Sequence, residues 1–175
     1  MCFIICTNIV ILSKRKAKMK KEIERKFLIK GDFMPHVISS TYIEQGYVAK
    51  SDDLTLRIRT RDEKGYITIK GRTNAAGMSR SEWEYEIPVK EARELLSFSK
   101  GTIKKHRYLV PVEGHMFEID RFYGQNEGLI MAEVELQAED EQYPRPDWLG
   151  EEVTGDRRYY NSQLLKHPYT TWYEK

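Results

Sequence analysis

Cysteine is almost absent from this chain of 175 residues, and its two cysteines, Cys2 and Cys6, both lie at the N-terminal end. The rest of the chain therefore forms no disulfide and offers no thiol nucleophile. The four histidines show no HxH or HExxH spacing, and no CxxC pair is present, so a zinc site is not expected. The GxxxxGK[ST], GxGxxG and GxSxG motifs are also missing, which leaves P-loop, dinucleotide-binding and hydrolase-elbow interpretations without support.

Long apolar runs are missing as well. The most apolar segment, Met1 to Leu12, is too short to span a bilayer, and it precedes the basic stretch Lys14 to Lys18, which is the reverse of the order in a secretory signal. We therefore expect a cytoplasmic protein without a membrane partner. We expect residues 1–18 to be a non-native or disordered extension, with translation starting at Met19, and residues 19–175 to form a single domain.

An excess of charge of one sign is also lacking. The 29 Lys and Arg residues are nearly balanced by 27 Asp and Glu, which gives a net charge of +2. This balance argues against a nucleic-acid partner that is recognised through overall basicity. Any site for an anion must therefore be local.

Charged side chains recur at two-residue spacing in six short segments. Because a strand sends alternate side chains to opposite faces, each set shares one face. The sets are Glu22, Glu24 and Lys26; Arg57 and Arg59; Thr68 and Lys70; Arg80, Glu82 and Glu84; Glu118 and Asp120; Glu133 and Glu135. A single such strand fits an ordinary solvated face, but here carboxylates cluster on some strands and cations on others. With the charged faces turned inward, an acidic wall would face a basic wall across a cavity suited to a metal-bound polyanion.

The order of predicted elements favours a β-rich domain. Val89 to Ser99 and Asp156 to Lys166 are predicted helices, the second with Asp156 as its N-cap. Many short strands with little helix predict a mainly β (α+β) fold, a closed eight-stranded antiparallel barrel. Its interior would be charged, and the helices would cover its outer apolar face. The strands are predicted at residues 22–30, 42–49, 54–61, 65–71, 79–88, 102–112, 115–122 and 129–138.

The charged sets predict both a metal site and a phosphate site. Paired carboxylates on neighbouring strands suit Mg²⁺ or Mn²⁺, which prefer oxygen ligands. The candidate ligands are Glu22, Glu24, Glu133 and Glu135, then Asp120, with Glu82 and Glu84 as secondary acidic residues. The candidate phosphate ligands are Lys26, Arg57, Arg59, Lys70, Arg80, Lys105, Arg107 and Arg158.

The candidate for activating water is Lys26, with Lys70 beside it. A lysine crowded by other cations can have its pKa lowered towards the range that is useful for a base. Tyr47 is a candidate to restrain Lys26 through its hydroxyl, and a purely structural hydrogen bond of that tyrosine is the alternative.

The segment Glu22-Ile-Glu-Arg-Lys26 resembles the ExExK signature of the CYTH superfamily, the triphosphate tunnel metalloenzymes. The resemblance runs from about Lys20 to Asn161 and looks closest to the small bacterial tripolyphosphatases. Supporting matches are Gln45-Gly-Tyr47, Leu56-Arg-Ile-Arg59, Thr68-Ile-Lys-Gly71, Ser79-Arg-x-Glu-x-Glu84, Lys105-x-Arg-Tyr108, Phe117-Glu-Ile-Asp120, Glu133-Val-Glu135, and Gly150 to Thr154 followed by Arg158-Tyr159-x-Asn161.

The resemblance implies an eight-stranded tunnel, dependence on a divalent metal and a linear triphosphate as substrate. By position it assigns metal binding to Glu22, Glu24, Glu133 and Glu135, with Asp120 near a second ion. It assigns phosphate binding to Lys26, Arg57, Arg59, Lys70, Arg80, Lys105 and Arg158. Arg121 departs from the family pattern, and by its phase we expect it to point outward.

Three functions remain open. The first is a metal-dependent hydrolase of inorganic tripolyphosphate, with nucleoside triphosphates as weaker substrates. The second is a class IV-type adenylate cyclase or a thiamine triphosphatase, and Lys20-Lys21 stand where the cyclases carry His-Phe, which favours the first. The third is a non-catalytic polyphosphate-binding module, which would not need both the carboxylates and Lys26. A homodimer is expected only because two-fold dimers are common.

Overall fold

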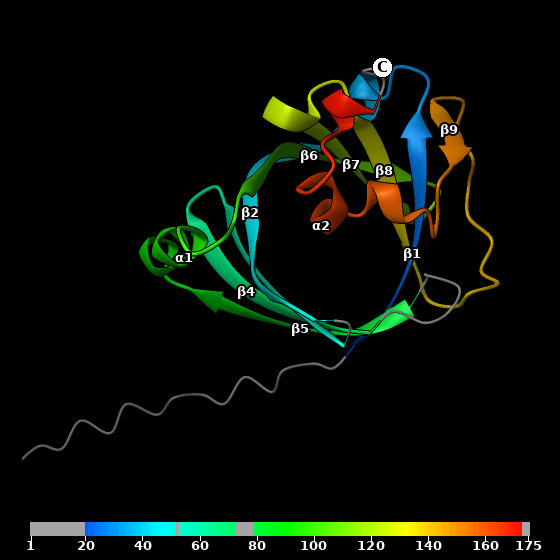
Figure 1. Cartoon of the computed structure of the whole chain (residues 1–175). Helices are drawn as coiled ribbons and strands as arrows, with labels where there is room; N and C mark the ends of the chain where they lie inside the picture. Colours follow the sequence, from blue (N-terminus) through cyan, green and yellow to red (C-terminus); the bar gives the residue numbers. More distant parts are fainter. Residues whose placement is uncertain (1–19, 52, 73–78, 173–175) are drawn as a thin grey trace, which may run out of the picture.

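The computed structural model describes residues 20–51, 53–72 and 79–172, and antiparallel strands make up most of it (Figure 1). The side chains of residues 20–22, 50, 79 and 80 are outside this description, as is the expected extension over residues 1–18. The strands are β1 (Lys20–Ile29), β2 (Ser39–Lys50), β3 (Leu54–Arg61), β4 (Lys64–Gly71), β5 (Ser79–Ile87), β6 (Thr102–Val112), β7 (His115–Tyr123), β8 (Ile130–Leu136) and β9 (Leu149–Glu152). The helices are α1 (Val89–Leu96) and α2 (Asn161–Leu164), and the 3₁₀ turns are η1 (Met34–His36), η2 (Gly124–Asn126), η3 (Arg157–Tyr159) and η4 (Tyr169–Thr171).

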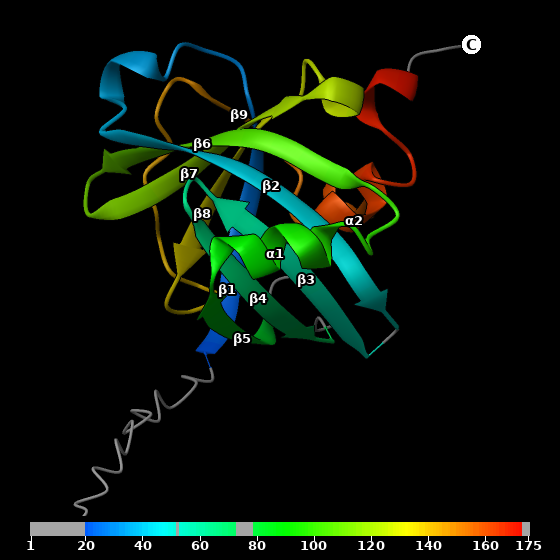
Figure 2. The same ribbon diagram turned by 90° about the vertical axis from the view of Figure 1, so that its left-hand side faces the viewer.

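The nine strands of the described residues form one antiparallel sheet in the order β5-β4-β3-β2-β6-β7-β8-β1-β9. Strand β1 also pairs with β5, from Lys20↔Glu82 to Ile23↔Ser79. In Figure 1 the strands encircle α2, whereas Figure 2 shows α1 on the outside, across β2, β3 and β4. The mainly β antiparallel fold is confirmed, and each of the eight predicted runs contains a strand. Strand β9 was not predicted, since four residues carry too little pattern to be recognised.

The two helices differ from their predictions in length. Helix α1 ends at Leu96 instead of Ser99. It packs closely on β4 because Gly65 has no side chain: a Cβ there would lie 2.6 Å from the Cβ of Ala92. The continuous helix predicted from Asp156 to Lys166 is wrong, because Tyr160 has an extended backbone (φ −72°, ψ 131°) that separates η3 from α2. No helix of the described residues is long and apolar enough to cross a membrane.

Apolar side chains are buried on both faces of the sheet. One cluster covers the outer face of β1, β6, β7 and β8, where fully buried Phe27, Phe117 and Val134 pack with Trp148. A second cluster contains side chains of the same strand phase as the charged ones and packs them against Leu164 of α2. They are Ile103, Phe122 and Met131, which follow the phase of Lys105, Asp120 and Glu133. The expectation of a charged interior with both helices on the outer apolar face is therefore wrong for α2 and for this part of the sheet.

Candidate active site

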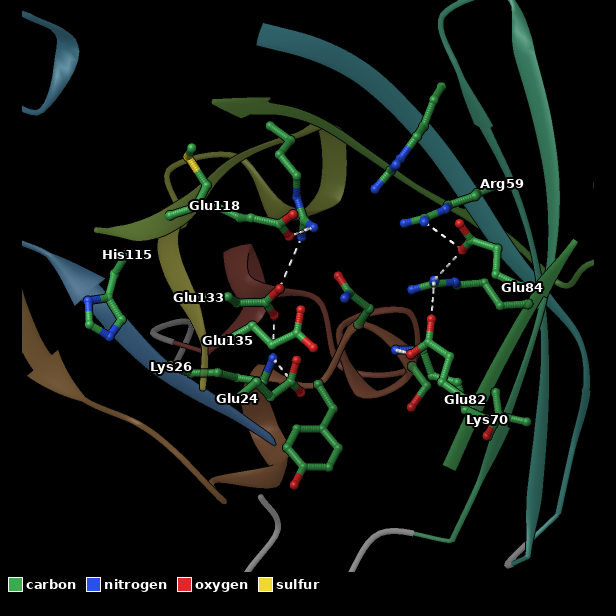
Figure 3. Close-up of a pocket in the computed structure, with 18 of the residues that line it drawn as sticks. Glu24, Lys26, Arg59, Lys70, Glu82, Glu84, His115, Glu118, Glu133 and Glu135 are labelled. Atoms are coloured by element: carbon green, nitrogen blue, oxygen red, sulfur yellow. Dashed lines mark hydrogen bonds and ion pairs between the residues drawn. The ribbon is translucent and has the colours of Figure 1, made fainter. Parts of the chain in front are cut away.

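A cavity of about 880 Å³ lies along the inner face of the sheet (Figure 3). Its wall is rich in charge, with charged side chains from seven strands. The charged residues on the strands are Glu24, Lys26, Arg57, Arg59, Arg61, Lys70, Glu82, Glu84, Arg107, Glu118, Glu133 and Glu135. The two-residue spacing of the sequence thus correctly predicted that most of these side chains share one face.

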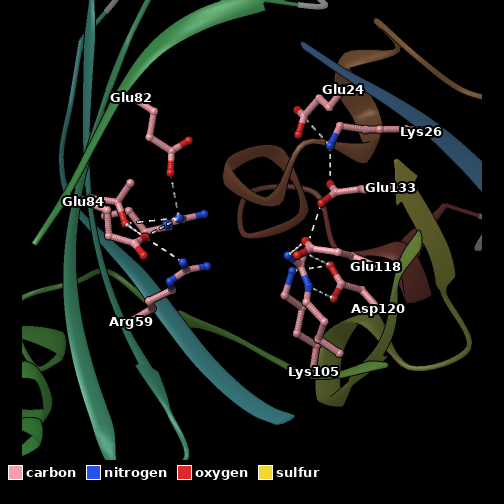
Figure 4. Close-up of polar contacts among 12 residues, drawn as sticks. Glu24, Lys26, Arg59, Glu82, Glu84, Lys105, Glu118, Asp120 and Glu133 are labelled. Carbon is pink, nitrogen blue, oxygen red and sulfur yellow. Dashed lines mark hydrogen bonds and ion pairs between the residues drawn. The ribbon is translucent and has the colours of Figure 1, made fainter. Parts of the chain in front are cut away.

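The ammonium of Lys26 lies between two carboxylates on one wall of this cavity. The pairing of β1 with β8 sets Lys26 opposite Glu133 and Glu24 opposite Glu135. The Lys26 Nζ lies 3.1 Å from Glu24 Oε1 and donates a hydrogen bond to Glu133 Oε1 (Figure 4). The other oxygen of Glu133 accepts from Arg107 Nη2 at 3.0 Å. Burial would raise the pKa of Glu133, but the charges of Lys26 and Arg107 outweigh it and hold that pKa well below its usual value.

The backbone of Lys26 is anchored by the segment after β9. Its amide donates to Thr154 Oγ1 at 3.0 Å, and its carbonyl accepts from the Val153 amide at 2.8 Å. In the residues that the structure describes, the ion pairs of the Lys26 ammonium are with the carboxylates of Glu24 and Glu133 and not with the cations that the sequence suggested. Lys70 is not beside it either, but on the opposite side of the cavity (Figure 3).

The opposite wall, from β3, β4 and β5, carries Arg57 and Arg59. Arg59 Nη2 lies 2.6 Å from Glu84 Oε2, and Lys70 Nζ lies 2.6 Å from Glu82 Oε2. Thr68, which is fully buried, accepts from Arg57 Nη2 at 3.1 Å and donates to Glu84 at 2.9 Å. Burial and the neighbouring charge of Arg57 lower the pKa of Arg59 to about 9, although Glu84 raises it. Each wall therefore contains both signs, and the simple picture of an acidic wall opposite a basic one is wrong.

Asp120 and Lys105 lie behind the cavity wall instead of on it. Asp120 is 0% exposed and Lys105 is 2% exposed, and neither lines the cavity. Asp120 accepts from Arg107 Nε at 2.7 Å and from Nη2 at 2.6 Å, and it also accepts from Lys105 Nζ (Figure 4). Burial would raise the pKa of Asp120, but the charges of Arg107 and Lys105 lower it below its usual value. Asp120 thus orients Arg107, whose Nη1 also donates to Glu118.

The remaining candidate site residues differ in whether they line the cavity. Tyr47 lines the cavity as expected. Arg158 does not: its guanidinium is paired with Asp156 at 2.6 Å, its side chain is 68% exposed, and it lines a separate surface pocket with Trp172. Arg158 lies outside the predicted strands, so no strand phase could predict the direction of its side chain. The backbones of Glu22 and Arg80 pair in the sheet, but their side chains lie outside the described residues.

The sequence analysis selected none of the C-terminal residues that line the cavity, although Asn161 belongs to the matched segment Arg158-Tyr159-x-Asn161. Tyr160, Asn161 and Ser162 line the cavity from the start of α2. Asn126 secures this segment, because its Oδ1 accepts from the Tyr169 amide at 2.8 Å and its Nδ2 donates to the Leu164 carbonyl at 3.4 Å. No strand phase could indicate these residues. Arg61 and Glu118, in contrast, share the phase of neighbours that were selected.

The carboxylates of this cavity suit a divalent cation in their chemistry. Glu24, Glu133 and Glu135 all line it, and they offer the hard oxygen donors that Mg²⁺ and Mn²⁺ bind. In the part of the chain that is described, however, no group of three or more His, Cys, Asp or Glu side chains is already arranged to hold a metal ion. The Lys26 ammonium occupies the position between two of the three.

The structure thus combines an antiparallel sheet with a charged cavity along one face. Residues 20–163 match the CYTH domain, and the chain belongs to this family.

Two relatives of this chain are inorganic triphosphatases. The chain is 46% identical over 158 residues to the inorganic triphosphatase of Acetivibrio thermocellus. The aligned region spans 89% of this chain and all of the relative. It is 36% identical over 148 residues to the inorganic triphosphatase of Nitrosomonas europaea. That aligned region spans 82% of this chain and 95% of the relative. A crystal structure of an inorganic triphosphatase superposes with a TM-score of 0.59 at 33% identity, over 82% of this chain and 93% of the other.

Proposed function

We propose that this chain is a metal-dependent triphosphatase that hydrolyses inorganic tripolyphosphate, with nucleoside triphosphates as weaker substrates. The observation that carries the proposal is a large cavity in which arginine and lysine side chains line both walls together with carboxylates that suit a divalent cation. The two inorganic triphosphatases that span 89% and 82% of the chain support it.

The phosphate-binding role belongs to the wall formed by β3 and β4. Arg57, Arg59 and Lys70 supply planar and point-charge donors that match phosphate oxygens. Glu84 and Thr68 hold Arg57 and Arg59 in place before a substrate arrives. A polyanion would relieve the mutual repulsion of the arginines, which already lowers the pKa of Arg59. Arg107 adds a guanidinium from the other wall, and Arg80 and Lys105 remain candidates without a described contact to the cavity.

The catalytic role is assigned to the wall that carries Lys26. Glu24, Glu133 and Glu135 would hold the divalent cation, which when bound neutralises phosphate charge and lowers the pKa of bound water. Lys26 orients the attacking water, and Lys70, on the other side of the cavity, holds the leaving phosphate oxygens. Hydrolysis forms a bond between the water oxygen and a terminal phosphorus while the bond from that phosphorus to the bridging oxygen breaks. Orthophosphate and pyrophosphate are the products.

A product analysis tests this function. Purified protein is incubated with tripolyphosphate, ATP or thiamine triphosphate, with Mg²⁺ or Mn²⁺ and then with EDTA. We expect orthophosphate and pyrophosphate from tripolyphosphate at the highest kcat/KM, and loss of the activity in EDTA. Cyclic AMP from ATP would instead identify a cyclase, and tight binding without turnover would identify a binding module. Either result would refute the proposal.

Three finer features belong to this proposal. The first is a closed eight-stranded tunnel, which the pairing of β1 with β5 supports. The second is the identity of the metal as Mg²⁺ or Mn²⁺, which the oxygen donors favour. The third is a homodimer in the cytoplasm, which size-exclusion chromatography with light scattering and cell fractionation would test.

A further inference from the structure

The position of the Lys26 ammonium coincides with the position where two strands bring carboxylates together. Glu24 lies on the same strand face as Lys26, two residues away, and Glu133 lies directly opposite Lys26 on β8. The ammonium contacts one oxygen of each, Oε1 of Glu24 at 3.1 Å and Oε1 of Glu133. These are two of the three described carboxylates that suit a divalent cation. One positive charge thus already occupies the point on which the acidic side chains converge.

We propose that Lys26 and the divalent cation compete for the same oxygens of Glu24 and Glu133, so that binding of the cation displaces the Lys26 ammonium. This inference rests on the proposed function, because it concerns the metal step of the same site. It makes Lys26 a group that opposes metal binding in the free protein. It also makes release of that lysine into the cavity a consequence of metal binding.

Charge and hydrogen bonding favour displacement over shared occupancy. A divalent ion about 4 Å from an ammonium is repelled by it. In a water-like dielectric, each unit of charge on the ion at that distance weakens its affinity for the site about fivefold. Glu133 does not need to move, because its Oε2 keeps the 3.0 Å hydrogen bond from Arg107 Nη2 while only Oε1 changes partner. The released ammonium remains beside the cavity that it lines and can contact a phosphate oxygen or the attacking water.

Titration of the wild-type protein and Lys26→Met with Mn²⁺ alone tests the proposal by isothermal calorimetry, without substrate. Removing the competing charge should tighten Mn²⁺ binding by about fivefold or more. Lys70→Met is the matched control, since it removes the same charge from the opposite wall of the cavity, where Lys70 pairs with Glu82. Its effect on Mn²⁺ affinity should stay below about twofold because intervening solvent and salt screen it.

Lys26→Arg provides a second variant in case the methionine variant does not fold. It keeps a positive charge between the carboxylates, so Mn²⁺ affinity should be unchanged or weaker. Tighter binding by this variant, or unchanged or weaker binding by a folded Lys26→Met, would overturn the proposal and show that Lys26 supports the metal site. Absence of Mn²⁺ binding to the wild-type protein would overturn it too. The comparison of Mn²⁺ affinity between the wild-type protein and its variants does not depend on whether tripolyphosphate is hydrolysed, so failure of this proposal is distinguishable from failure of the proposed function.

Discussion

Lys105 is a buried lysine, and because burial changes the pKa of its ammonium, its contribution to stability depends on pH. The side chain is 2% exposed and donates to Asp120, while its Nζ lies 5.4 Å from the centre of the Phe122 ring. Burial lowers the pKa of Lys105 to about 8 from its ordinary 10.5, although the charge of Asp120 raises it. Between these two values the unfolded chain binds the proton and the folded protein does not, so stability rises with pH.

The magnitude follows from the two pKa values. Integrated from pH 7 to pH 10, a folded-state pKa of about 8 against 10.5 gives a gain of about 2.5 kcal/mol. Lys105→Met removes this titration and leaves the Arg107–Asp120 pair, with its bonds of 2.7 and 2.6 Å, in place. We therefore expect the free energy of unfolding of the wild-type protein, relative to Lys105→Met, to increase by about that amount between pH 7 and pH 10.

Urea unfolding at four pH values, followed by tryptophan fluorescence, measures this difference. Taking the difference between the two proteins cancels the titration of groups that they share. Lys64→Met, at a lysine whose side chain is 62% exposed, controls for the general effect of losing one positive charge. If the difference between wild type and Lys105→Met varies by less than about 0.5 kcal/mol across the range, the reasoning from burial is refuted.

Three further substitutions have expected outcomes. Arg59→Met should lower kcat/KM for tripolyphosphate about 10-fold to 100-fold, because a charge-assisted hydrogen bond contributes about 1.5–3 kcal/mol; a change below twofold in phosphate release would contradict its role. Asp120→Asn should cost about 3–5 kcal/mol in urea unfolding, since it leaves Lys105 and Arg107 buried without their carboxylate; a loss under about 1 kcal/mol would mean that other groups compensate. Phe117→Ala empties a fully buried position on the outer face and should cost about 3–5 kcal/mol with KM unchanged; an altered KM would show that the outer core shapes the cavity.

The part of this protein that can be predicted from sequence is the part that depends on local geometry. Side-chain direction in a strand alternates with every residue, so spacing alone placed Glu24 with Lys26, Arg57 with Arg59, and Glu133 with Glu135 on common faces. The same rule located the eight longer strands and the mainly antiparallel fold.

The tertiary structure decided how far along each strand a side chain lies and what stands opposite it. Phase cannot distinguish Glu118, which lines the cavity, from Asp120, which is sealed behind it, because the two share one face and differ only in depth. Strand register set Lys26 opposite Glu133 instead of beside Lys70, and chain reversal after β9 brought Asn161 to the cavity. Lys26 and Glu133 are 107 positions apart in the sequence, and only the folded sheet determines that they meet.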